Sequence, residues 1–167
     1  QRAKISSPIY SNMSNVYIGL GSNLGDRKKN ITNATVILGS VMGDIKILSS
    51  IYETKPWGFS SNNLFLNAVI LIETDCTPET CLQMAKRIEE EMGRTYAHHE
   101  RYEDRVIDID ILLYDDITIH TESLTIPHPL IQEREFVLQP LSEIAPELIH
   151  PVLNKPIKDL LEELEKK

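Results

Sequence analysis

The sequence contains no apolar run long enough to cross a lipid bilayer, and its first residues lack the apolar core of a secretory signal peptide. Basic residues are also scarce: 17 Lys and Arg stand against 25 Asp and Glu, which gives a net charge of −8. This charge argues against nonspecific binding to nucleic acid or to anionic membranes. An anionic ligand would therefore need a local basic cluster or metal ions.

Cysteine is scarce as well, with only Cys76 and Cys81 in the chain. The two lie close together at an expected helix start, where disulfide geometry is rare. Cys81 falls on the apolar stripe of that helix, so we expect a buried thiol. A zinc site with His98 and His99 would need further ligands at a spacing that the sequence does not offer. The cysteine usage therefore favours a reducing cytoplasm.

What is present describes an ordinary globular protein. Hydrophobic residues make up 41% and charged residues 25% of the 167 residues, which is typical of one domain with its own core. Residues 1–12 show no sustained periodicity, so we interpret them as a disordered leader, a tag remnant or a linker. We expect residues 13–167 to form a single domain.

Strand and helix patterns alternate along this domain. The expected elements are a strand at 16–20, a helix after Asp26, strands at 45–51 and 65–72, a helix from Thr77 to Gly93, and a strand within 105–114. The first helix has its apolar positions at Ile31, Ala34, Leu38 and Val41, and the second strand alternates through Ile45, Ile47, Ser49 and Ile51. The order β-α-β-β-α-β predicts a ferredoxin-like α+β core, with helices packed on an antiparallel sheet. Short strands, short helices and a final amphipathic helix at 156–165 should follow.

Two aspartates one residue apart are the most informative feature of the expected sheet. In a strand, Asp108 and Asp110 share one face, about 7 Å apart over two rises of about 3.3 Å. Burial of both carboxylates would be costly, and a divalent cation such as Mg²⁺ would remove their repulsion. The alternative is a half-exposed edge strand whose aspartates meet water. The strand by itself does not decide between them.

The polar segment 94–105 places basic side chains immediately before the aspartates. Arg94, Arg101 and Arg105 could bind phosphate oxygens in a bidentate manner. Arginines beside metal-binding carboxylates are the groups that phosphoryl transfer requires. The alternative is a solvated loop in which acidic neighbours pair with the arginines, and the adjacent aspartates make the functional interpretation the better one.

Four other side chains are candidates with open alternatives. Asn67 could hydrogen-bond the edge of a heterocycle or a nearby loop. His128, between two prolines, could reach a phosphate or lie in a surface turn. Phe136 could stack on a ligand ring or belong to the core, and Trp57 could contact a ligand or cover the core. The glycine turn at 19–25 has neither Rossmann nor Walker A spacing, so we interpret it as a tight strand-to-helix turn that could line a site.

Seven ordered segments together carry a resemblance to one family. They are G-L-G-S-N-L-G-D-R (19–27), Y-E-T-K-P-W-G (52–58), F-L-N-A-V (65–69), E-x-x-x-G-R (89–94), R-V-I-D-I-D-I-L-L-Y (105–114), I-P-H-P (126–129) and R-E-F-V-L-Q-P-L (134–141). From about Val16 to Leu164 the chain resembles the 6-hydroxymethyl-7,8-dihydropterin pyrophosphokinases of the folate pathway.

The resemblance implies transfer of the terminal diphosphate of ATP to the pterin hydroxymethyl group, with release of AMP. It implies that Asp108 and Asp110 hold two Mg²⁺ ions and that Arg94 and Arg105 neutralise charge during transfer. The implied nucleotide side comprises Glu89, Arg101, Ile111, His128 and Arg134. The implied pterin side comprises Thr54, Pro56, Trp57, Asn67, Tyr102 and Phe136. The implied partners are these small molecules and other folate enzymes, fused or adjacent, with no nucleic acid or membrane.

The chain departs from the family pattern before the aspartates. Where the family usually reads R-W-G-P-R, this chain has Tyr102, Glu103 and Asp104 between two arginines. Tyr102 could still cover the pterin, whereas the acidic pair replaces a rigid Gly-Pro. Phe65 stands where the family often has tyrosine. Two rival functions are a metal-dependent nuclease, which the acidic charge opposes, and a non-catalytic ferredoxin-like binding module.

Overall fold

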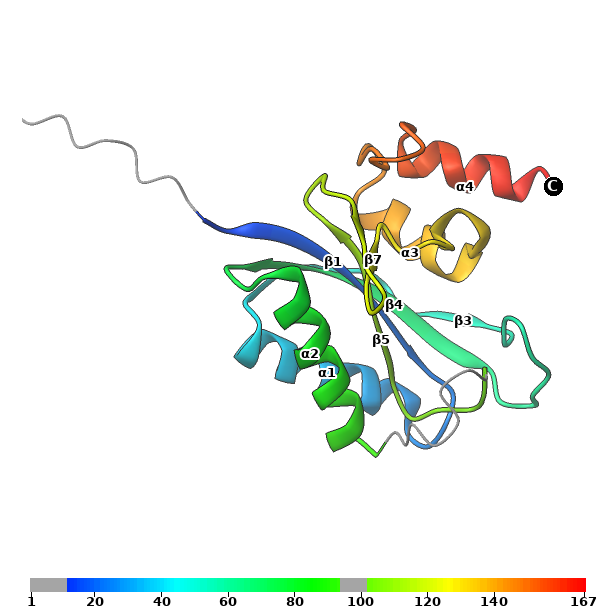
Figure 1. Cartoon of the computed structure of the whole chain (residues 1–167). Helices are drawn as coiled ribbons and strands as arrows, with labels where there is room; N and C mark the ends of the chain where they lie inside the picture. The colour runs from blue at the N-terminus through cyan, green and yellow to red at the C-terminus, as the bar shows by residue number, and fades with distance from the viewer. Residues whose placement is uncertain (1–11, 94–101) are drawn as a thin grey trace, which may run out of the picture.

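A five-stranded antiparallel sheet forms the centre of the computed structural model, which describes residues 12–93 and 102–167 (Figure 1). The strands are β1 (Ser14–Ser22), β2 (Asp44–Leu48), β3 (Tyr52–Thr54), β4 (Phe65–Thr74) and β5 (Asp108–Tyr114). The order is β2-β4-β1-β5, and β3 pairs with β4 beyond the end of β2. The expected α+β class with an antiparallel sheet is therefore confirmed.

Helices cover both faces of this sheet (Figure 1). Helices α1 (Arg27–Val41) and α2 (Pro78–Glu91) pack on one face, whereas α3 (Glu135–Ile144) and α4 (Ile157–Glu165) pack on the other. Between β5 and α3 the chain forms β6 (Ile119–His120), β7 (Thr125–Ile126) and the 3-10 helix η1 (Ile131–Glu133). The short C-terminal elements and the final helix are thus confirmed. Within the described residues, no helix is long and apolar enough to cross a membrane.

Helices α1 and α2 begin at the capping residues that the sequence predicts. Asp26 accepts a hydrogen bond from the amide of Lys29 at 3.2 Å, and Thr77 accepts one from the amide of Thr80 at 3.2 Å. Pro78 occupies the first turn of α2. Gly93, just past the end of α2, has a φ of +101°, which a residue without Cβ adopts at little cost.

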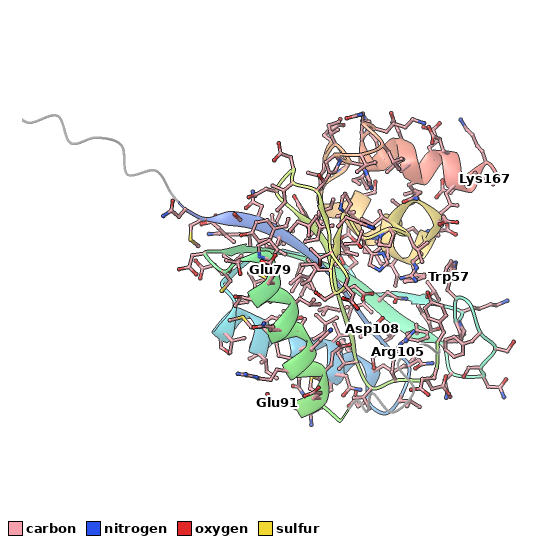
Figure 2. The ribbon with its side chains drawn as sticks, viewed as in Figure 1. Trp57, Glu79, Glu91, Arg105, Asp108 and Lys167 are labelled. Carbon is pink, nitrogen blue, oxygen red and sulfur yellow. The ribbon has the colours of Figure 1, made fainter. Side chains whose placement is uncertain are left out.

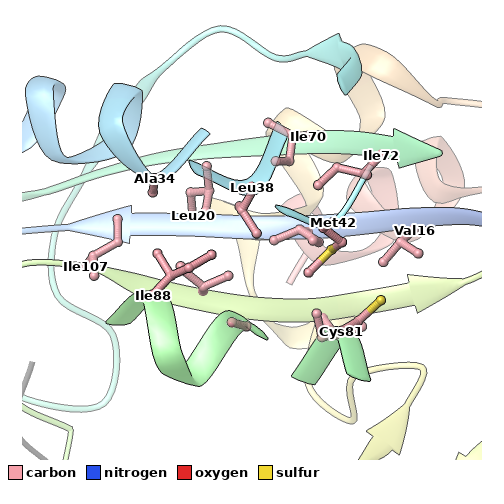
Figure 3. Packing of buried hydrophobic residues seen from close by; sticks show 14 of the residues in the cluster. Val16, Leu20, Ala34, Leu38, Met42, Ile70, Ile72, Cys81, Ile88 and Ile107 are labelled. Atoms are coloured by element: carbon pink, nitrogen blue, oxygen red, sulfur yellow. The ribbon is translucent and has the colours of Figure 1, made fainter. Parts of the chain in front are cut away.

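The main core lies between the sheet and these two helices. Figure 3 shows Ala34 and Leu38 of α1, and Cys81 and Ile88 of α2, facing the apolar side chains of the central strands. Cys81 is fully buried, as expected, and both cysteines are free thiols. A second cluster on the opposite face holds Leu138 and its neighbours from α3 and α4. Because both faces are covered, β4 is buried along almost its whole length.

The unbroken second strand and one position of the first helix were predicted wrongly. The strand predicted over 45–51 ends at Leu48, and β3 begins only at Tyr52. At Ser49 the hydroxyl accepts the bond from the Val69 amide at 2.9 Å, whereas the Ser49 amide still donates to the Val69 carbonyl at 2.9 Å. Ile47 and Ile51 are exposed, at 41% and 37%, so the predicted alternation does not give a buried face there. In α1, the apolar stripe continues from Leu38 to buried Met42, so Val41 is 47% exposed.

Candidate active site

A cavity lies at the end of the central strands, on the sheet face that carries α3. Its walls come from β1, β4, the start of β5, the loop after β3 and the start of α3. The lining residues are Gly19, Leu20, Gly21, Thr54, Lys55, Trp57, Phe65, Asn67, Ala68, Val69, Tyr102, Arg105, Asp108, Asp110, Arg134, Phe136 and Val137. The structure thus brings together nine of the fifteen candidate residues, including both aspartates.

The two aspartates stand at the start of β5, opposite glycines of β1. Asp108 pairs with Gly21 and Asp110 with Gly19 across the ladder. A Cβ at position 21 would lie 3.2 Å from Oδ1 of Asn67 and 3.9 Å from Cβ of Asp108, so a side chain there would crowd the cavity floor. Gly19 and Gly21 therefore line the site, as residues of β1 rather than of the turn predicted at 19–25.

The electrostatics of the pair favour a bound cation. Burial, and then the charge of Asp108, raise the pKa of Asp110 to about 8, and Arg134 opposes this. No cluster of three or more His, Cys, Asp or Glu side chains that could hold a metal occurs among the described residues. Two carboxylates without a protein cage suit Mg²⁺, which takes its remaining ligands from water and substrate phosphates.

Arg105 lies beside these carboxylates, within the same cavity. Its Nε is 3.9 Å from Oδ2 of Asp108, and its guanidinium carbon is 5.3 Å from the centre of the Phe65 ring. Only 12% of the side chain is exposed. Figure 2 shows Arg105 and Asp108 close together. A cation held here could stabilise negative charge on an oxyanion next to the aspartates.

Asn23 holds the segment that carries Arg105. Oδ1 of Asn23 accepts a hydrogen bond from the Arg105 amide at 2.7 Å, and the Asn23 amide donates to the Arg105 carbonyl at 3.0 Å. Because these bonds replace strand pairing, β5 begins at Asp108, later than position 105. Sequence reasoning missed this role, although an asparagine within a glycine turn was a usable signal.

Asp104 extends the same contact to a third loop. It accepts hydrogen bonds from the side-chain amides of Asn23 at 2.7 Å and Asn63 at 2.8 Å. Hydrogen bonding, first from Ser61, lowers the pKa of Asp104 below its ordinary value. The residue that replaces the family's proline thus joins the loops after β1 and β3 to Arg105.

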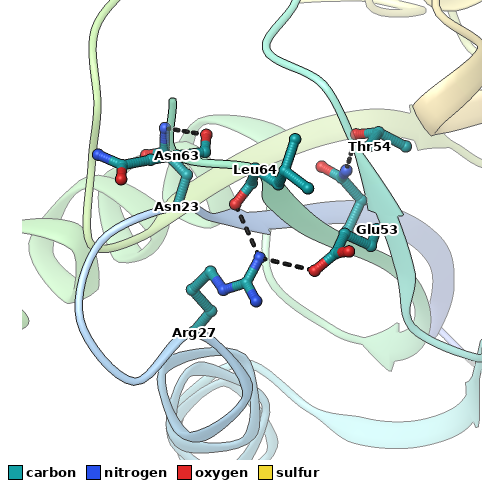
Figure 4. A network of polar contacts seen from close by, with 7 residues as sticks. Asn23, Arg27, Glu53, Thr54, Asn63 and Leu64 are labelled. Carbon is teal, nitrogen blue, oxygen red and sulfur yellow. Dashed lines mark hydrogen bonds and ion pairs between the residues drawn. The ribbon is translucent and has the colours of Figure 1, made fainter. Parts of the chain in front are cut away.

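A parallel set of contacts anchors the loop after β3 (Figure 4). Nη1 of Arg27 donates to Glu53 at 3.0 Å and to the Leu64 carbonyl at 2.9 Å. Asn67, which is 5% exposed, donates its side-chain amide to Oγ1 of Thr54 at 2.7 Å. Asn67 therefore has the local partner that was its alternative explanation, and it also lines the cavity.

Aromatic side chains enclose Arg134 at the other side of the cavity. Its guanidinium carbon lies 4.5 Å from the ring centre of Trp57, 5.8 Å from that of Tyr102 and 5.6 Å from that of Phe136. Nη2 of Arg134 donates a hydrogen bond to the Tyr102 hydroxyl at 3.0 Å. Trp57 and Tyr102 meet edge to face, with ring centres 5.8 Å apart.

His128 lies outside the cavity lining but near its charged groups. Burial, then the charge of Arg134, lower the pKa of His128 to about 4, and Asp108 opposes this. Nδ1 of His128 accepts a hydrogen bond from the Leu130 amide at 3.2 Å. The imidazole is therefore neutral at pH 7 and can donate through Nε2.

Five other candidates are not part of the cavity lining. Glu89 is buried beneath β5 and accepts a bond from the Ile109 amide at 3.3 Å, and Ile111 belongs to the main core. Pro56 lines a neighbouring open groove. Arg94 and Arg101 lie outside the described residues. Their proposed roles stay predictions, whereas Lys55 is a basic residue of the cavity that sequence reasoning did not single out.

Comparisons with known proteins agree on one family. The family model described as 7,8-dihydro-6-hydroxymethylpterin-pyrophosphokinase (HPPK) matches residues 17–146. The 2-amino-4-hydroxy-6-hydroxymethyldihydropteridine pyrophosphokinase of Aquifex aeolicus is 44% identical over 149 residues, which cover 88% of this chain and 90% of that protein. The folic acid synthesis protein fol1 of Schizosaccharomyces pombe is 41% identical over 89% of this chain but only 20% of its own length.

Solved structures share the fold. The crystal structure of Plasmodium falciparum HPPK-DHPS has a TM-score of 0.73 at 19% identity and covers 90% of this chain. The chain spans 44% of the length of that solved protein. At this identity the likeness concerns the fold alone.

Proposed function

The chain belongs to the 7,8-dihydro-6-hydroxymethylpterin-pyrophosphokinase family and is a pyrophosphokinase of folate biosynthesis, and we propose that it transfers the terminal diphosphate of ATP to the hydroxymethyl group of 6-hydroxymethyl-7,8-dihydropterin, with release of AMP. The observation that carries the proposal is one cavity that unites a carboxylate pair, a largely buried arginine and the aromatic side chains of Trp57, Tyr102 and Phe136. Phosphoryl chemistry needs the first two groups, and a flat heterocycle suits the third.

Asp108 and Asp110 are the residues that would hold magnesium. Their hard oxygen donors fit Mg²⁺, as does the raised pKa of Asp110, which burial and then the charge of Asp108 cause, and we propose two ions. When bound, the metal would offset the negative charge of the ATP phosphates.

The other residues of the site position the two substrates and stabilise the charge on the transferring group. We assign Arg105 to the charge that develops on the transferring group, because it lies beside the carboxylates at low exposure. Asn67 presents an amide to the edge of the pterin, and Phe136 a ring to its face. His128 and Arg134 are assigned to the nucleotide phosphates. We assign no side-chain base.

The proposal includes the setting of the reaction. Relatives such as fol1 carry this region within a much longer chain, so we propose that this domain works with other folate enzymes, fused or adjacent. The free thiols of Cys76 and Cys81 support a reducing cytoplasm as its compartment.

Calorimetric titration with a non-hydrolysable ATP analogue, with and without Mg²⁺, tests the proposal. A pyrophosphokinase should bind the analogue only with metal and should then bind the pterin more tightly. A nuclease would instead cleave nucleic acid in the presence of metal, and a binding module would take up neither ligand. AMP release from ATP that depends on the pterin substrate is the positive result. Its absence in the full chain with Mg²⁺ would refute the assignment.

A further inference from the structure

An arginine side chain occupies the aromatic enclosure in which the proposed function needs a flat heterocycle. Arg134 is only 6% exposed, although it is charged, and its Nε has no hydrogen-bond partner among the described residues. Rings of Trp57, Tyr102 and Phe136 surround its guanidinium at 4.5 to 5.8 Å. The cavity around them retains about 40 Å³, the space of a few water molecules.

The guanidinium resembles part of the expected substrate. It is planar, carries N–H donors along its edge and stacks on aromatic faces. The pyrimidine ring of a pterin contains the same arrangement, a carbon bonded to three nitrogens, one of them an exocyclic amino group. An enclosure that suits one group therefore suits the other, and both cannot be present together.

Tyr102 holds the arginine in this position. Its hydroxyl accepts the bond from Nη2 of Arg134 at 3.0 Å, and its ring meets Trp57 edge to face. Gly58 permits this packing, because a Cβ there would lie 3.1 Å from the Tyr102 ring. The tryptophan that the family usually has at this position could not accept the bond, since an indole only donates. The bond therefore depends on the tyrosine hydroxyl at this position.

We propose that Tyr102 and Arg134 form a latch that closes the pterin slot until nucleotide phosphates draw the arginine out. The inference rests on the proposed function, because it takes the enclosure as the pterin slot and Arg134 as a phosphate ligand. Triphosphate oxygens satisfy the guanidinium fork more fully than one phenol and three rings do, so nucleotide favours the open state. Tyr102 is then a positioning residue that acts through Arg134.

The latch predicts a specific change in the coupling between the two ligands. Affinity for 6-hydroxymethylpterin, a stable oxidised analogue, is measured by calorimetry on the full chain, with and without a non-hydrolysable ATP analogue and Mg²⁺. In Tyr102→Phe the affinity without nucleotide should rise about 3- to 10-fold, the worth of one hydrogen bond, and the gain produced by nucleotide should shrink accordingly. Tyr102→Trp should also raise the affinity without nucleotide and reduce the gain produced by nucleotide.

A matched control removes a tyrosine hydroxyl elsewhere. The Tyr114 hydroxyl donates to the Cys76 carbonyl at 2.7 Å, away from the cavity, so Tyr114→Phe should leave the coupling as in wild type. Thermal melting verifies that each variant is folded. Trp57 is the only tryptophan, so its emission offers a second readout: nucleotide should shift it in wild type towards the emission of ligand-free Arg134→Ala.

Three results would overturn the latch. One is an affinity without nucleotide that stays within twofold of wild type in Tyr102→Phe. Another is a smaller coupling that arises only because the ternary affinity falls, which would mean that the hydroxyl contacts the pterin directly. The third is Trp57 emission that nucleotide leaves unchanged. Failure of the proposed function looks different, because no variant would then bind the pterin even with nucleotide present.

Discussion

At the scale of single residues, the fold holds two like charges close together and partly removes them from water. Asp110 is held near Asp108 in a partly buried position, and its raised pKa measures the cost of that arrangement. Arg105 lies close enough to reduce the cost, with its Nε 3.9 Å from Oδ2 of Asp108. Such a site is better matched to a ligand that brings cations and phosphates together than to the empty state.

Replacing one carboxylate should separate activity from stability. Asp110→Asn keeps the shape but loses the charge, so AMP formation that depends on Mg²⁺ should fall by about 100-fold or more. The free energy of unfolding at pH 7 should rise by about 1 kcal/mol, because a destabilised carboxylate is removed. Assays and denaturant titrations check both, with Asp116→Asn in an exposed turn as the control. Wild-type turnover in Asp110→Asn would contradict the metal role.

The position of Arg105 predicts an effect on turnover rather than on binding. Arg105→Ala should lower kcat about 100-fold while KM for ATP and pterin changes much less, because the arginine stabilises charge that develops during transfer. Arg105→Lys should recover only part of the loss, since an ammonium lacks the planar fork. Steady-state kinetics show whether kcat or KM changes. An unchanged kcat with a raised KM would make Arg105 a simple binding residue.

At the scale of elements, hydrogen bonds join three separate loops to one another beside the cavity. Asn23 follows β1, Asn63 precedes β4 and Asp104 precedes β5, and hydrogen bonds of 2.7 and 2.8 Å join them. Two bonds between Asn23 and Arg105, one through the Asn23 side chain and one between the backbones, complete the connection. The family's rigid Gly-Pro is therefore replaced in this chain by a hydrogen-bonded carboxylate.

Loss of this carboxylate should loosen Arg105 without touching the reacting groups. Asp104→Ala removes an acceptor from the buried Asn23 amide and from the exposed Asn63 amide, and we expect kcat to fall about 10-fold, with a loss of about 1–2 kcal/mol in stability. The neighbouring Glu103 is exposed, so Glu103→Ala serves as the control and should change neither. Steady-state kinetics and denaturant titrations measure kcat and the free energy of unfolding of both variants. Equal effects of the two substitutions would show that only the net charge of the segment matters.

At the scale of the whole molecule, acid should destabilise the fold through a histidine that is held neutral. Burial lowers the pKa of His128 from 6.5 to about 4. Because the unfolded chain takes up this proton first, stability is intact above pH 6.5 and is lost as the pH falls from there towards 4. The loss by pH 5 should be about 2 kcal/mol.

Denaturant titrations at pH 7.5 and pH 5 of wild type and His128→Asn isolate this contribution. The variant should lose about 2 kcal/mol less than wild type between the two pH values, since the other titrating groups are common to both. His150, whose pKa burial also lowers, remains in both proteins. If the two proteins lose the same stability, His128 is not held neutral in the folded state.

The sequence by itself determined the order of elements and the placement of the aspartates. Capping by Asp26 and Thr77, the apolar stripe of the second helix and the alternation around Asp108 and Asp110 are local patterns, which depend on neighbours within one turn or one strand. The ordered segments also identified the family. At Ser49, by contrast, the hydroxyl accepts a bond from the Val69 amide of β4, a contact that the local pattern does not show.

Only the tertiary structure decided how the loops meet. Asn23 and Asp104 are 81 positions apart, and Tyr102 and Arg134 are 32 positions apart, so no periodicity links them. The burial of Arg134 among three rings depends on where packing places the loop after β3, the segment before β5 and the start of α3. Hydrogen bonds and ring contacts of this kind form wherever packing brings their partners together, and packing is a property of the whole chain rather than of any window within it.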